Sequence, residues 1–418
     1  MNNILIKPSK LKGEINPPPS KSLTHRAIIC ASLCKDGISL VDNVILSDDI
    51  LATIEGMKKL GAEIEINNNT NNTYKLHIRG IRGNIEHTEI DCRESGSTLR
   101  FLIPVALMVT NSCTFTGRGR LIERPLDTYY EIFREKNIIY ENNNGKLPLT
   151  VSGKLRGGNY TLSGKLSSQF VSGLLFALPL IREDSIITIR DKMESAPYVD
   201  LTLDILKKFN INIENISYKQ FLVPGDSLYK ASSYTVEGDY SQAAFYIVAK
   251  ALGNNVECVG LNENSLQGDK EIVNIIKEYY KDEITIDVSQ IPDLVPIIAV
   301  LGSLQKGKTT RIINARRLRI KESDRLKVIS TEINKLGGEI EELEDGLLIR
   351  GKENLKGGVT VSSWKDHRIA MALAIAATRC KDEIILQDYL AVNKSYPDFW
   401  KDYTSLGGRV WAPYGEIN

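Results

Sequence analysis

The amino-acid sequence predicts an α/β protein that is divided into two domains. Helix-forming and strand-forming segments alternate along the whole chain, which is typical of the α/β class. The chain also has 418 residues, more than one hydrophobic core usually supports. One pattern of helices and strands recurs six times, and six copies in two globular halves would be three copies per half.

Each copy opens with a helix of small and apolar residues, which a polar or glycine turn connects to a β-branched strand. A loop that ends in aspartate then leads to a second, amphipathic helix and, usually through Leu-Gly, to another strand. The first copy opens at Ser20, turns at Asp36-Gly37, passes Asp48-Asp49 and closes at Leu60-Gly61. The later copies open at Ser95, Ser167, Asp239, Asp293 and Asp366, and they pass Asp127, Asp200, Asp269, Asp324 and Asp398. We expect the boundary between the two halves near residues 234–238, after the polar stretch 224–227.

The composition excludes several classes of function. Apolar residues make up 42% and charged residues 25% of the chain, as in ordinary globular proteins. A net charge of +1 gives no overall field that would attract nucleic acid or a membrane surface. No apolar run is long enough to span a bilayer, and residues 1–7 are typical of a strand rather than a signal peptide. We therefore expect a cytoplasmic enzyme or binding protein with no nucleic-acid or membrane partner.

Neither a disulfide nor a metal site is expected. The six cysteines are scattered without a CxxC pair or metal-type spacing, and the four histidines form no HxxH or HExxH motif.

The most unusual stretch is residues 316–325, RRLRIKESDR, which holds five cations and two carboxylates. Charge runs are usually solvated loops, and Ser323 would then only cap the following helix. Alternatively, Lys321 and Arg325 bind an anion while Glu322, held among cations, transfers a proton.

The starts of the opening helices favour the second interpretation. If equivalent ends of repeated units point to a common centre, free backbone N–H groups and positive helix dipole ends converge there, which suits a strongly anionic ligand. Residues suited to anions or protons stand at these starts: Lys21, Ser22, Gly96, Ser97, Ser167, Ser168, Gln169, Asp293, His367 and Arg368.

Individual residues strengthen this prediction. Lys21 lies in a first helical turn, where the dipole disfavours a cation, so a bound anion explains it better than capping by Ser20 does. Helix capping alone would account for Asp293, but its equivalence to Lys21 favours a base at the common centre. Four cations at turns before or at helix starts predict an anion clamp: Arg124, Arg325, Arg368 and Lys394.

Nine motifs cover essentially the whole chain in order. They are residues 19–26 (PSKSLTHR), Gly96 with Arg100, 124–126 (RPL), 167–169 (SSQ), 195–198 (SAPY), 236–239 (VEGD), 319–325 (RIKESDR), 366–368 (DHR) and 394–398 (KSYPD). Together they resemble the 5-enolpyruvylshikimate-3-phosphate synthase family. The resemblance implies a two-domain inside-out α/β barrel with three βαβαββ units per domain and the active site in the interdomain cleft. It also implies that the N-terminal strand joins the C-terminal domain, giving domains of residues 1–18 plus 236–418 and 19–235.

The resemblance implies transfer of the enolpyruvyl group of phosphoenolpyruvate to the 5-hydroxyl of shikimate 3-phosphate, with release of phosphate and without a cofactor or metal. The implied ligands of shikimate 3-phosphate are Lys21, Ser22, Arg26, Ser167, Ser168, Gln169, Ser195, Tyr198, Asp293, Arg317 and Lys321. The implied ligands of phosphoenolpyruvate are Lys21, Gly96, Arg100, Arg124, Gln169, Arg325, Arg368 and Lys394. We assign Glu322 as proton donor to the methylene carbon, Asp293 as acceptor of the hydroxyl proton, and Lys21 as a participant in the proton transfers.

Three positions depart from the family pattern. Arg317 stands where many members carry Asn, Ser97 replaces a common Thr, and Phe101 replaces a frequent Pro. Gly96 is retained, and in this family it accompanies inhibition by glyphosate at the phosphoenolpyruvate site. We therefore expect inhibition, although Phe101 could shift the helix that presents Gly96.

Two other functions are compatible with this scaffold. One is enolpyruvyl transfer to UDP-N-acetylglucosamine, which typically uses a loop cysteine, whereas Cys113 here lies in a strand-like run. The other is a catalytically silent anion-binding protein, which the presence of Lys21, Asp293 and Glu322 argues against. With no heptad pattern or apolar surface stripe, we expect a monomer.

Overall fold

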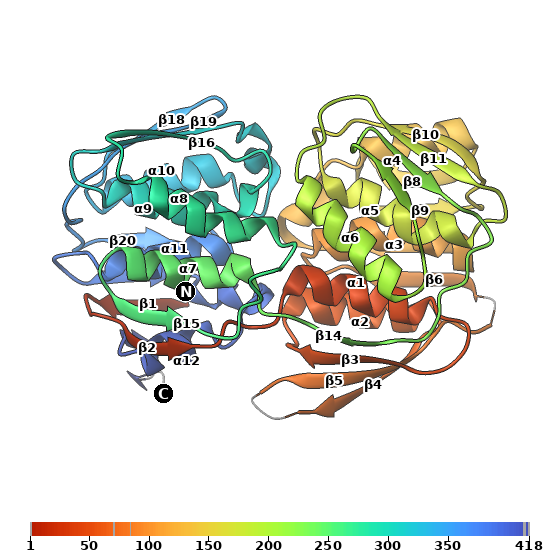
Figure 1. The fold of residues 1–418 in the computed structure, drawn as a ribbon, viewed down its shortest axis with the longest axis horizontal. Helices are drawn as coiled ribbons and strands as arrows, with labels where there is room; N and C mark the ends of the chain where they lie inside the picture. Colours follow the sequence, from red (N-terminus) through yellow and green to blue (C-terminus); the bar gives the residue numbers. More distant parts are fainter. Residues whose placement is uncertain (1, 70–71, 84, 413–414, 417–418) are drawn as a thin grey trace. The chain divides into compact units, whose positions relative to one another are not determined.

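The structure is a computed structural model that describes residues 2–69, 72–83, 85–412 and 415–416. It divides into two compact units (Figure 1). Unit 1 comprises Met1–Pro18 and Gly238–Asn418, and unit 2 comprises Pro19–Glu237.

Unit 2 contains three pairs of helices and three sheets. Its helices are α1 (Lys21–Ser32), α2 (Asp48–Lys59), α3 (Gly96–Val109), α4 (Asp127–Lys136), α5 (Ser168–Ala177) and α6 (Ala196–Lys208), with 3-10 helices η1 (Gly119–Glu123) and η2 (Leu178–Leu180). Its strands are β3 (Ser39–Val44), β4 (Glu63–Asn68), β5 (Tyr74–Arg79), β6 (Ile85–Asp91), β7 (Thr110–Thr116), β8 (Ile139–Asn143), β9 (Lys146–Ser152), β10 (Gly158–Leu162), β11 (Ser185–Ile189), β12 (Glu214–Ile216), β13 (Gln220–Val223) and β14 (Ser233–Thr235).

Within the described residues, unit 1 also has three pairs of α-helices and three sheets. Its helices are α7 (Tyr240–Ala251), α8 (Ile272–Glu278), α9 (Val295–Ser303), α10 (Arg325–Lys335), α11 (His367–Ala377) and α12 (Phe399–Ser405), with η3 (Gly268–Glu271), η4 (Pro292–Leu294), η5 (Arg316–Ile320) and η6 (Tyr389–Lys394). Its strands are β1 (Asn3–Lys7), β2 (Lys12–Ile15), β15 (Asn255–Cys258), β16 (Glu283–Asp287), β17 (Thr309–Ile313), β18 (Ile340–Leu343), β19 (Gly346–Arg350), β20 (Thr360–Ser362), β21 (Ile384–Gln387), β22 (Arg409–Ala412) and β23 (Gly415–Glu416).

The sheets repeat one pairing pattern, in which a parallel pair is followed by two antiparallel pairs. The strand orders are β14-β3-β5-β4, β6-β7-β9-β8 and β10-β11-β13-β12 in unit 2 and β16-β17-β19-β18 in unit 1. The sheet β20-β21-β1-β22-β23 follows the pattern too, but its third strand comes from the start of the chain, with Leu5 opposite Ile385 and Trp411. A parallel pair of β2 and β15 completes unit 1.

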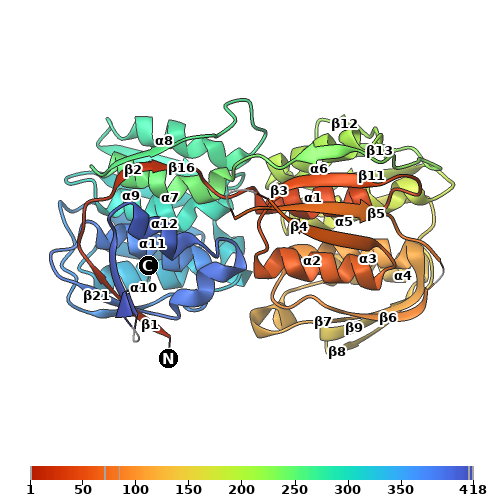
Figure 2. The same ribbon diagram turned by 90° about the horizontal axis from the view of Figure 1, so that it is seen from below.

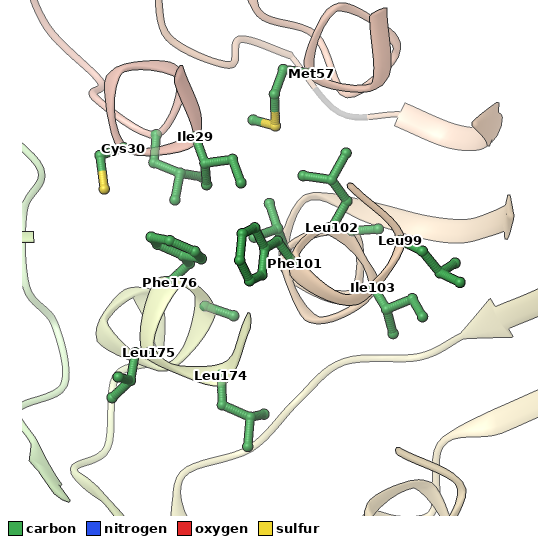
Figure 3. Close-up of a cluster of buried hydrophobic side chains, with 14 of the residues drawn as sticks. Ile29, Cys30, Met57, Leu99, Phe101, Leu102, Ile103, Leu174, Leu175 and Phe176 are labelled. Carbon is green, nitrogen blue, oxygen red and sulfur yellow. The ribbon is translucent and has the colours of Figure 1, made fainter. Parts of the chain in front are cut away.

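In unit 2, the opening helices of the repeats lie inside and the sheets lie outside (Figures 1 and 2). The opening helices α3 and α5 are apolar on nearly all sides, and such helices are stable only when they are buried all round, whereas α1 also buries the polar side chains of Thr24, His25 and Arg26. Phe101 from α3 packs edge-on against Phe176 from α5, with ring centroids 5.4 Å apart, beside Ile29 and Cys30 of α1 (Figure 3). The second helices, such as α2 and α10, are amphipathic and bury one face. Each repeat thus places the start of a buried helix after a short loop.

Within the described residues, no helix is both long enough and apolar enough to cross a membrane.

Candidate active site

In unit 2, Lys21 is the first residue of α1 and forms an ion pair at a second helix start. Its Nζ lies 2.8 Å from Oδ2 of Asp49, in the first turn of α2, and both side chains are mostly buried. Ser20, the residue before α1, makes no side-chain capping bond. The negative charge of Asp49 therefore stabilises an ammonium group that the dipole of α1 disfavours.

Arg26 carries a buried positive charge in the second turn of α1. Its side chain donates to Oγ1 of Thr202 at 2.8 Å, to the carbonyl of Ser22 at 2.7 Å and to the carbonyl of Tyr198 at 2.8 Å. Among the described residues, all of these acceptors are neutral. The guanidinium also lies over the ring of Phe101, 5.1 Å from its centroid. Burial lowers the pKa of Arg26 from 12.5 to about 10, so the group remains charged at neutral pH without a carboxylate among these acceptors.

Gly96 is the first residue of α3, and three side chains approach it closely. A Cβ atom on Gly96 would lie 2.7 Å from Nη1 of Arg124, 3.1 Å from Nη1 of Arg100 and 3.7 Å from Oε1 of Gln169. Arg100 Nη1 donates to Gln169 Oε1 at 2.9 Å, and Gln169 Nε2 donates to Oγ of Ser97 at 2.9 Å. The missing side chain thus allows two guanidinium groups and an amide to converge on a helix start, whose own N–H groups favour an anion.

Three predicted serines and Tyr198 lie at the starts of α5 and α6. The Oγ of Ser167 caps α5 by accepting from the backbone N–H of Gln169 at 3.3 Å, and Ser168 is buried as the first residue of α5. Ser195 precedes α6 with a left-handed backbone (φ 56°), and its carbonyl accepts from the N–H of Tyr198 at 3.0 Å. The name unit 2 cluster is used below for these residues: Lys21, Arg26, Gly96, Arg100, Arg124, Ser167, Ser168, Gln169, Ser195 and Tyr198.

In unit 1, Arg325 is the centre of a network of three carboxylates. Its Nη1 lies 2.8 Å from Oδ1 of Asp293, its Nη2 lies 2.8 Å from Oε2 of Glu322, and its Nε lies 2.9 Å from Oδ2 of Asp366. The side chain of Arg325 is 1% exposed. Burial opposes its charge, but Asp366, Glu322 and Asp293 raise its pKa above the ordinary value. Arg325 therefore fixes the positions of both carboxylates that we expect to transfer protons.

Asp366 connects this network to the start of α11. It is fully buried, caps α11 by accepting from the N–H of Arg368 at 3.0 Å, and accepts from Oγ of Ser323 at 3.0 Å. Nη2 of Arg368 in turn lies 3.0 Å from Oδ2 of Asp293. We call Asp293, Lys321, Glu322, Arg325, Asp366 and Arg368 the unit 1 cluster.

The charges of the unit 1 cluster perturb one another. Burial alone would raise the pKa of Asp293, but Arg368, Lys321 and Arg325 hold it well below its ordinary value. Burial lowers the pKa of Lys321 to about 8, although Asp293 and Glu322 oppose that change. Burial and the nearby charge of Asp293 raise the pKa of Asp269 to about 6. Two groups of this region thus titrate near neutral pH.

Two further predicted residues bind backbone carbonyl groups in unit 1. Arg317 Nη2 donates to the carbonyl of Ser289 at 2.5 Å, and Arg317 also lowers the pKa of Lys321. Lys394, at the end of η6, donates to the carbonyl of Lys365 at 2.9 Å, and Lys365 immediately precedes Asp366.

The structure excludes helix capping as the role of Asp293 and of Ser323. Asp293 does not cap α9, because it lies within η4 and α9 begins two residues later at Val295. Ser323 does not cap α10 either, since Asp324 does so by accepting from the N–H of Lys327 at 3.2 Å. Both side chains are thereby available for the contacts with Arg325 and Asp366 described above.

Sequence reasoning missed Asp366 as a member of the unit 1 cluster, and Asp49 and Asp269 as charged neighbours of Lys21 and Asp293. All three were noted only as landmarks or motif positions of the repeat, where an aspartate at a helix start is adequately explained as a cap. The one signal that could have identified them is their place in the repeats, since Asp49 and Asp269 are equivalent positions and Asp366 precedes the predicted cation Arg368 by two residues.

Comparison with known proteins identifies the family. Residues 5–403 match the family model described as EPSP synthase (3-phosphoshikimate 1-carboxyvinyltransferase). A relative named 3-phosphoshikimate 1-carboxyvinyltransferase from Clostridium novyi (strain NT) is 53% identical and covers 98% of both chains. A protein of the same name from Clostridioides difficile (strain 630) is 48% identical, again with 98% of both chains covered.

A solved EPSP synthase structure from Acinetobacter baumannii has a similar fold. It superimposes with a TM-score of 0.78 at 22% identity, covering 99% of this chain and 100% of the other. The predicted α/β class and two-domain inside-out fold are thus confirmed. Because the matches to the family model and to the curated relatives extend over nearly the whole chain, the protein belongs to the EPSP synthase (3-phosphoshikimate 1-carboxyvinyltransferase) family.

Proposed function

We propose that the protein transfers the enolpyruvyl group of phosphoenolpyruvate to the 5-hydroxyl of shikimate 3-phosphate and releases phosphate. Family membership supports the reaction. Both substrates are multiply anionic, and both clusters contain buried or partly buried cations. We further propose that the enzyme acts as a monomer in the cytoplasm, which light scattering of the purified protein and cell fractionation would test.

The observation that carries the proposal is the buried guanidinium of Arg26. A buried charge is costly unless a partner compensates it, and hydrogen bonds to neutral acceptors compensate it only in part. A phosphate group would supply the missing charge. We therefore propose that Arg26 binds shikimate 3-phosphate, together with Lys21, Ser22, Ser167, Ser168, Gln169, Ser195, Tyr198, Asp293, Arg317 and Lys321.

The convergence at Gly96 supports a second anion site. Arg100 and Arg124 each present an Nη1 atom to the start of α3, where backbone N–H groups add to the positive potential. Guanidinium groups bind carboxylate and phosphate oxygens in pairs. We propose that phosphoenolpyruvate binds Lys21, Gly96, Arg100, Arg124, Gln169, Arg325, Arg368 and Lys394.

The addition step of the reaction requires two coupled proton transfers, and the elimination step requires a third. The methylene carbon of phosphoenolpyruvate gains a proton while the 5-hydroxyl loses one and its oxygen attacks C2. The tetrahedral adduct then loses phosphate from C2 and a proton from the new methyl group, which restores the double bond. We assign Glu322 as the donor to the methylene carbon and Asp293 as the acceptor of the hydroxyl proton, with Lys21 sharing the proton transfers.

The cations around Asp293 control its strength as a base. Arg368, Lys321 and Arg325 depress its pKa, which favours the ionised form but makes a weak base. Substrate anions that bind Arg368 and Arg325 would neutralise part of the positive charge that depresses the pKa of Asp293. We propose that the basicity of Asp293 therefore increases when both substrates are bound.

Phosphate release by the purified protein tests the proposal. Phosphoenolpyruvate is supplied alone, with shikimate 3-phosphate, or with UDP-N-acetylglucosamine. Release with shikimate 3-phosphate only is the expected result. Release with UDP-N-acetylglucosamine would instead identify that sugar nucleotide as the acceptor. Cys113, however, is a buried residue of β7 and is not on a loop. Binding of shikimate 3-phosphate without turnover would indicate a silent anion-binding protein.

A further inference from the structure

The turn between β20 and α11 has an unusual backbone. Two consecutive residues, Trp364 (φ 52°) and Lys365 (φ 58°), adopt the left-handed conformation. Glycine and asparagine tolerate this conformation, whereas tryptophan and lysine rarely adopt it. Such strain persists only where the surroundings impose it, and it is concentrated at functional sites.

A buried carboxylate holds the turn. Glu332 of α10 is fully buried, and its Oε1 accepts from the indole Nε1 of Trp364 at 2.8 Å. Its Oε2 accepts from the backbone N–H of Ser362 at 3.1 Å, and Lys335 compensates its charge at 2.9 Å. The side chain of Trp364 is 51% exposed, so this tryptophan does not fill the core. The indole bonds to Glu332, which fixes the turn to α10, while the backbone N–H of Trp364 donates to Oγ of Ser362 at 3.0 Å.

The turn leads directly to predicted site residues. The carbonyl of Lys365 accepts from Nζ of Lys394 at 2.9 Å. The next residue, Asp366, caps α11 and binds Nε of Arg325. A movement of the strained turn would therefore displace the acceptor that orients the Lys394 ammonium group.

We propose that Glu332 and Trp364 are positioning residues, which lock the Lys365 carbonyl so that Lys394 is held ready for an anionic substrate. This proposal rests on the proposed function, in which Lys394 binds phosphoenolpyruvate. Trp364 and Glu332 act only through the turn and make no contact with the reacting atoms. The turn thus sets the affinity for phosphoenolpyruvate.

The first test is Trp364→Phe, which removes the Nε1–H donor but keeps an aromatic ring. Losing one hydrogen bond to a buried carboxylate, with only part of the loss reaching Lys394, should raise KM for phosphoenolpyruvate about threefold to tenfold. KM for shikimate 3-phosphate should stay as in the wild type, and Tm should fall by only a few degrees, because one hydrogen bond to a charged group contributes about 1.5–3 kcal/mol. Trp411→Phe in β22 is the matched control, because it makes the same exchange in unit 1 away from the turn. An unchanged KM for phosphoenolpyruvate in Trp364→Phe would overturn the proposal.

Lys365→Gly provides a second variant with a different signature. Glycine adopts φ 58° without strain and keeps the carbonyl group, so Tm should be unchanged or higher. The added backbone freedom should nevertheless raise KM for phosphoenolpyruvate. If the turn served stability alone, Lys365→Gly would change Tm, and the KM values for phosphoenolpyruvate and shikimate 3-phosphate would change alike. That result would contradict the proposal.

A double-mutant cycle with Lys394→Ala separates this proposal from the one it rests on. If the turn acts through Lys394, Trp364→Phe should raise KM for phosphoenolpyruvate by less than about twofold in the Lys394→Ala background. Full additivity would overturn the positioning role. If Lys394→Ala alone left that KM unchanged, the assignment of Lys394 in the proposed function would be wrong. An effect of Lys394→Ala without an effect of Trp364→Phe would reject only the role of the turn.

Discussion

Replacing Arg26 by methionine should separate binding from stability. The charged guanidinium is buried with neutral acceptors, and its pKa is lowered from 12.5 to about 10. That depression corresponds to about 3 kcal/mol against the charged form. Its three hydrogen bonds come from a charged donor and contribute about 1.5–3 kcal/mol each, or roughly 5–9 kcal/mol together. The hydrogen bonds outweigh the cost of burial by roughly 2–6 kcal/mol. Because their acceptors have other partners, Arg26→Met should lower the free energy of unfolding by no more than about 4 kcal/mol.

The groups that Arg26 contacts have other partners, which limits the cost of the substitution. Oγ1 of Thr202 also donates to the carbonyl of Tyr198 at 3.0 Å and forms a bond of 2.7 Å with Oγ of Ser172. Methionine can keep contact with the ring of Phe101. Thr202 and the carbonyl of Tyr198 therefore keep a hydrogen-bond partner when Arg26 is replaced.

The affinity for shikimate 3-phosphate should fall independently of this change in stability. Hydrogen bonds between charged groups contribute about 1.5–3 kcal/mol each, so a guanidinium that binds phosphate in a pair should contribute at least about 3 kcal/mol, equivalent to roughly 100-fold in Kd. Calorimetric titration with shikimate 3-phosphate and urea denaturation measure the two quantities. Arg190→Met, which removes an exposed arginine paired with Glu131 at 3.2 Å, is the matched control. An unchanged Kd, or a loss of more than about 4 kcal/mol in stability, would refute the reasoning.

Other substitutions test the remaining assignments. Asp293→Asn and Glu322→Gln should each reduce kcat about 100-fold or more, and near-normal turnover of both in steady-state assays would end the proposed division of proton transfers. KM for shikimate 3-phosphate should rise as the pH passes about 8, where Lys321 loses its proton, and Lys321→Met should abolish this dependence. Because its pKa is lowered on folding from 10.5, Lys321 should also make the fold more stable as the pH rises from about 8 to 10.5; a urea titration series measures this. Glyphosate should compete with phosphoenolpyruvate, and full turnover in millimolar glyphosate at low phosphoenolpyruvate would exclude it. Gly96→Ala should raise KM for phosphoenolpyruvate, because its Cβ would displace a guanidinium that lies 2.7 Å away.

The position of Phe101 illustrates how far a family pattern can guide interpretation. The sequence identifies it only as a departure beside Arg100. In the structure, its ring packs edge-on against Phe176 (Figure 3). It also contacts the ring of His25 edge-on, and the guanidinium of Arg26 lies over it. The departure therefore belongs to the packing of α1, α3 and α5, and local sequence cannot reveal such a contact.

The sequence by itself determined the class of fold, the repeated helix pairs and most of the cations. These features are local: apolar periodicity sets each helix, and turn residues set its ends. The starts of the buried helices α1, α3, α5 and α11 at Lys21, Gly96, Ser168 and His367 could therefore be predicted to within a residue or so.

Only the tertiary structure decided which charged side chains form pairs. Asp293 and Asp366 lie 32 and 41 residues from Arg325 in the sequence, yet both bind it, together with its local neighbour Glu322. Asp49 meets Lys21 across 28 residues, and Glu332 meets Trp364 across 32. A charged side chain looks the same in the sequence whether it is solvated or buried, because its energy depends on the dielectric and the partners that folding provides. The pairing of these groups, and hence the chemistry of each, follows from packing between distant segments.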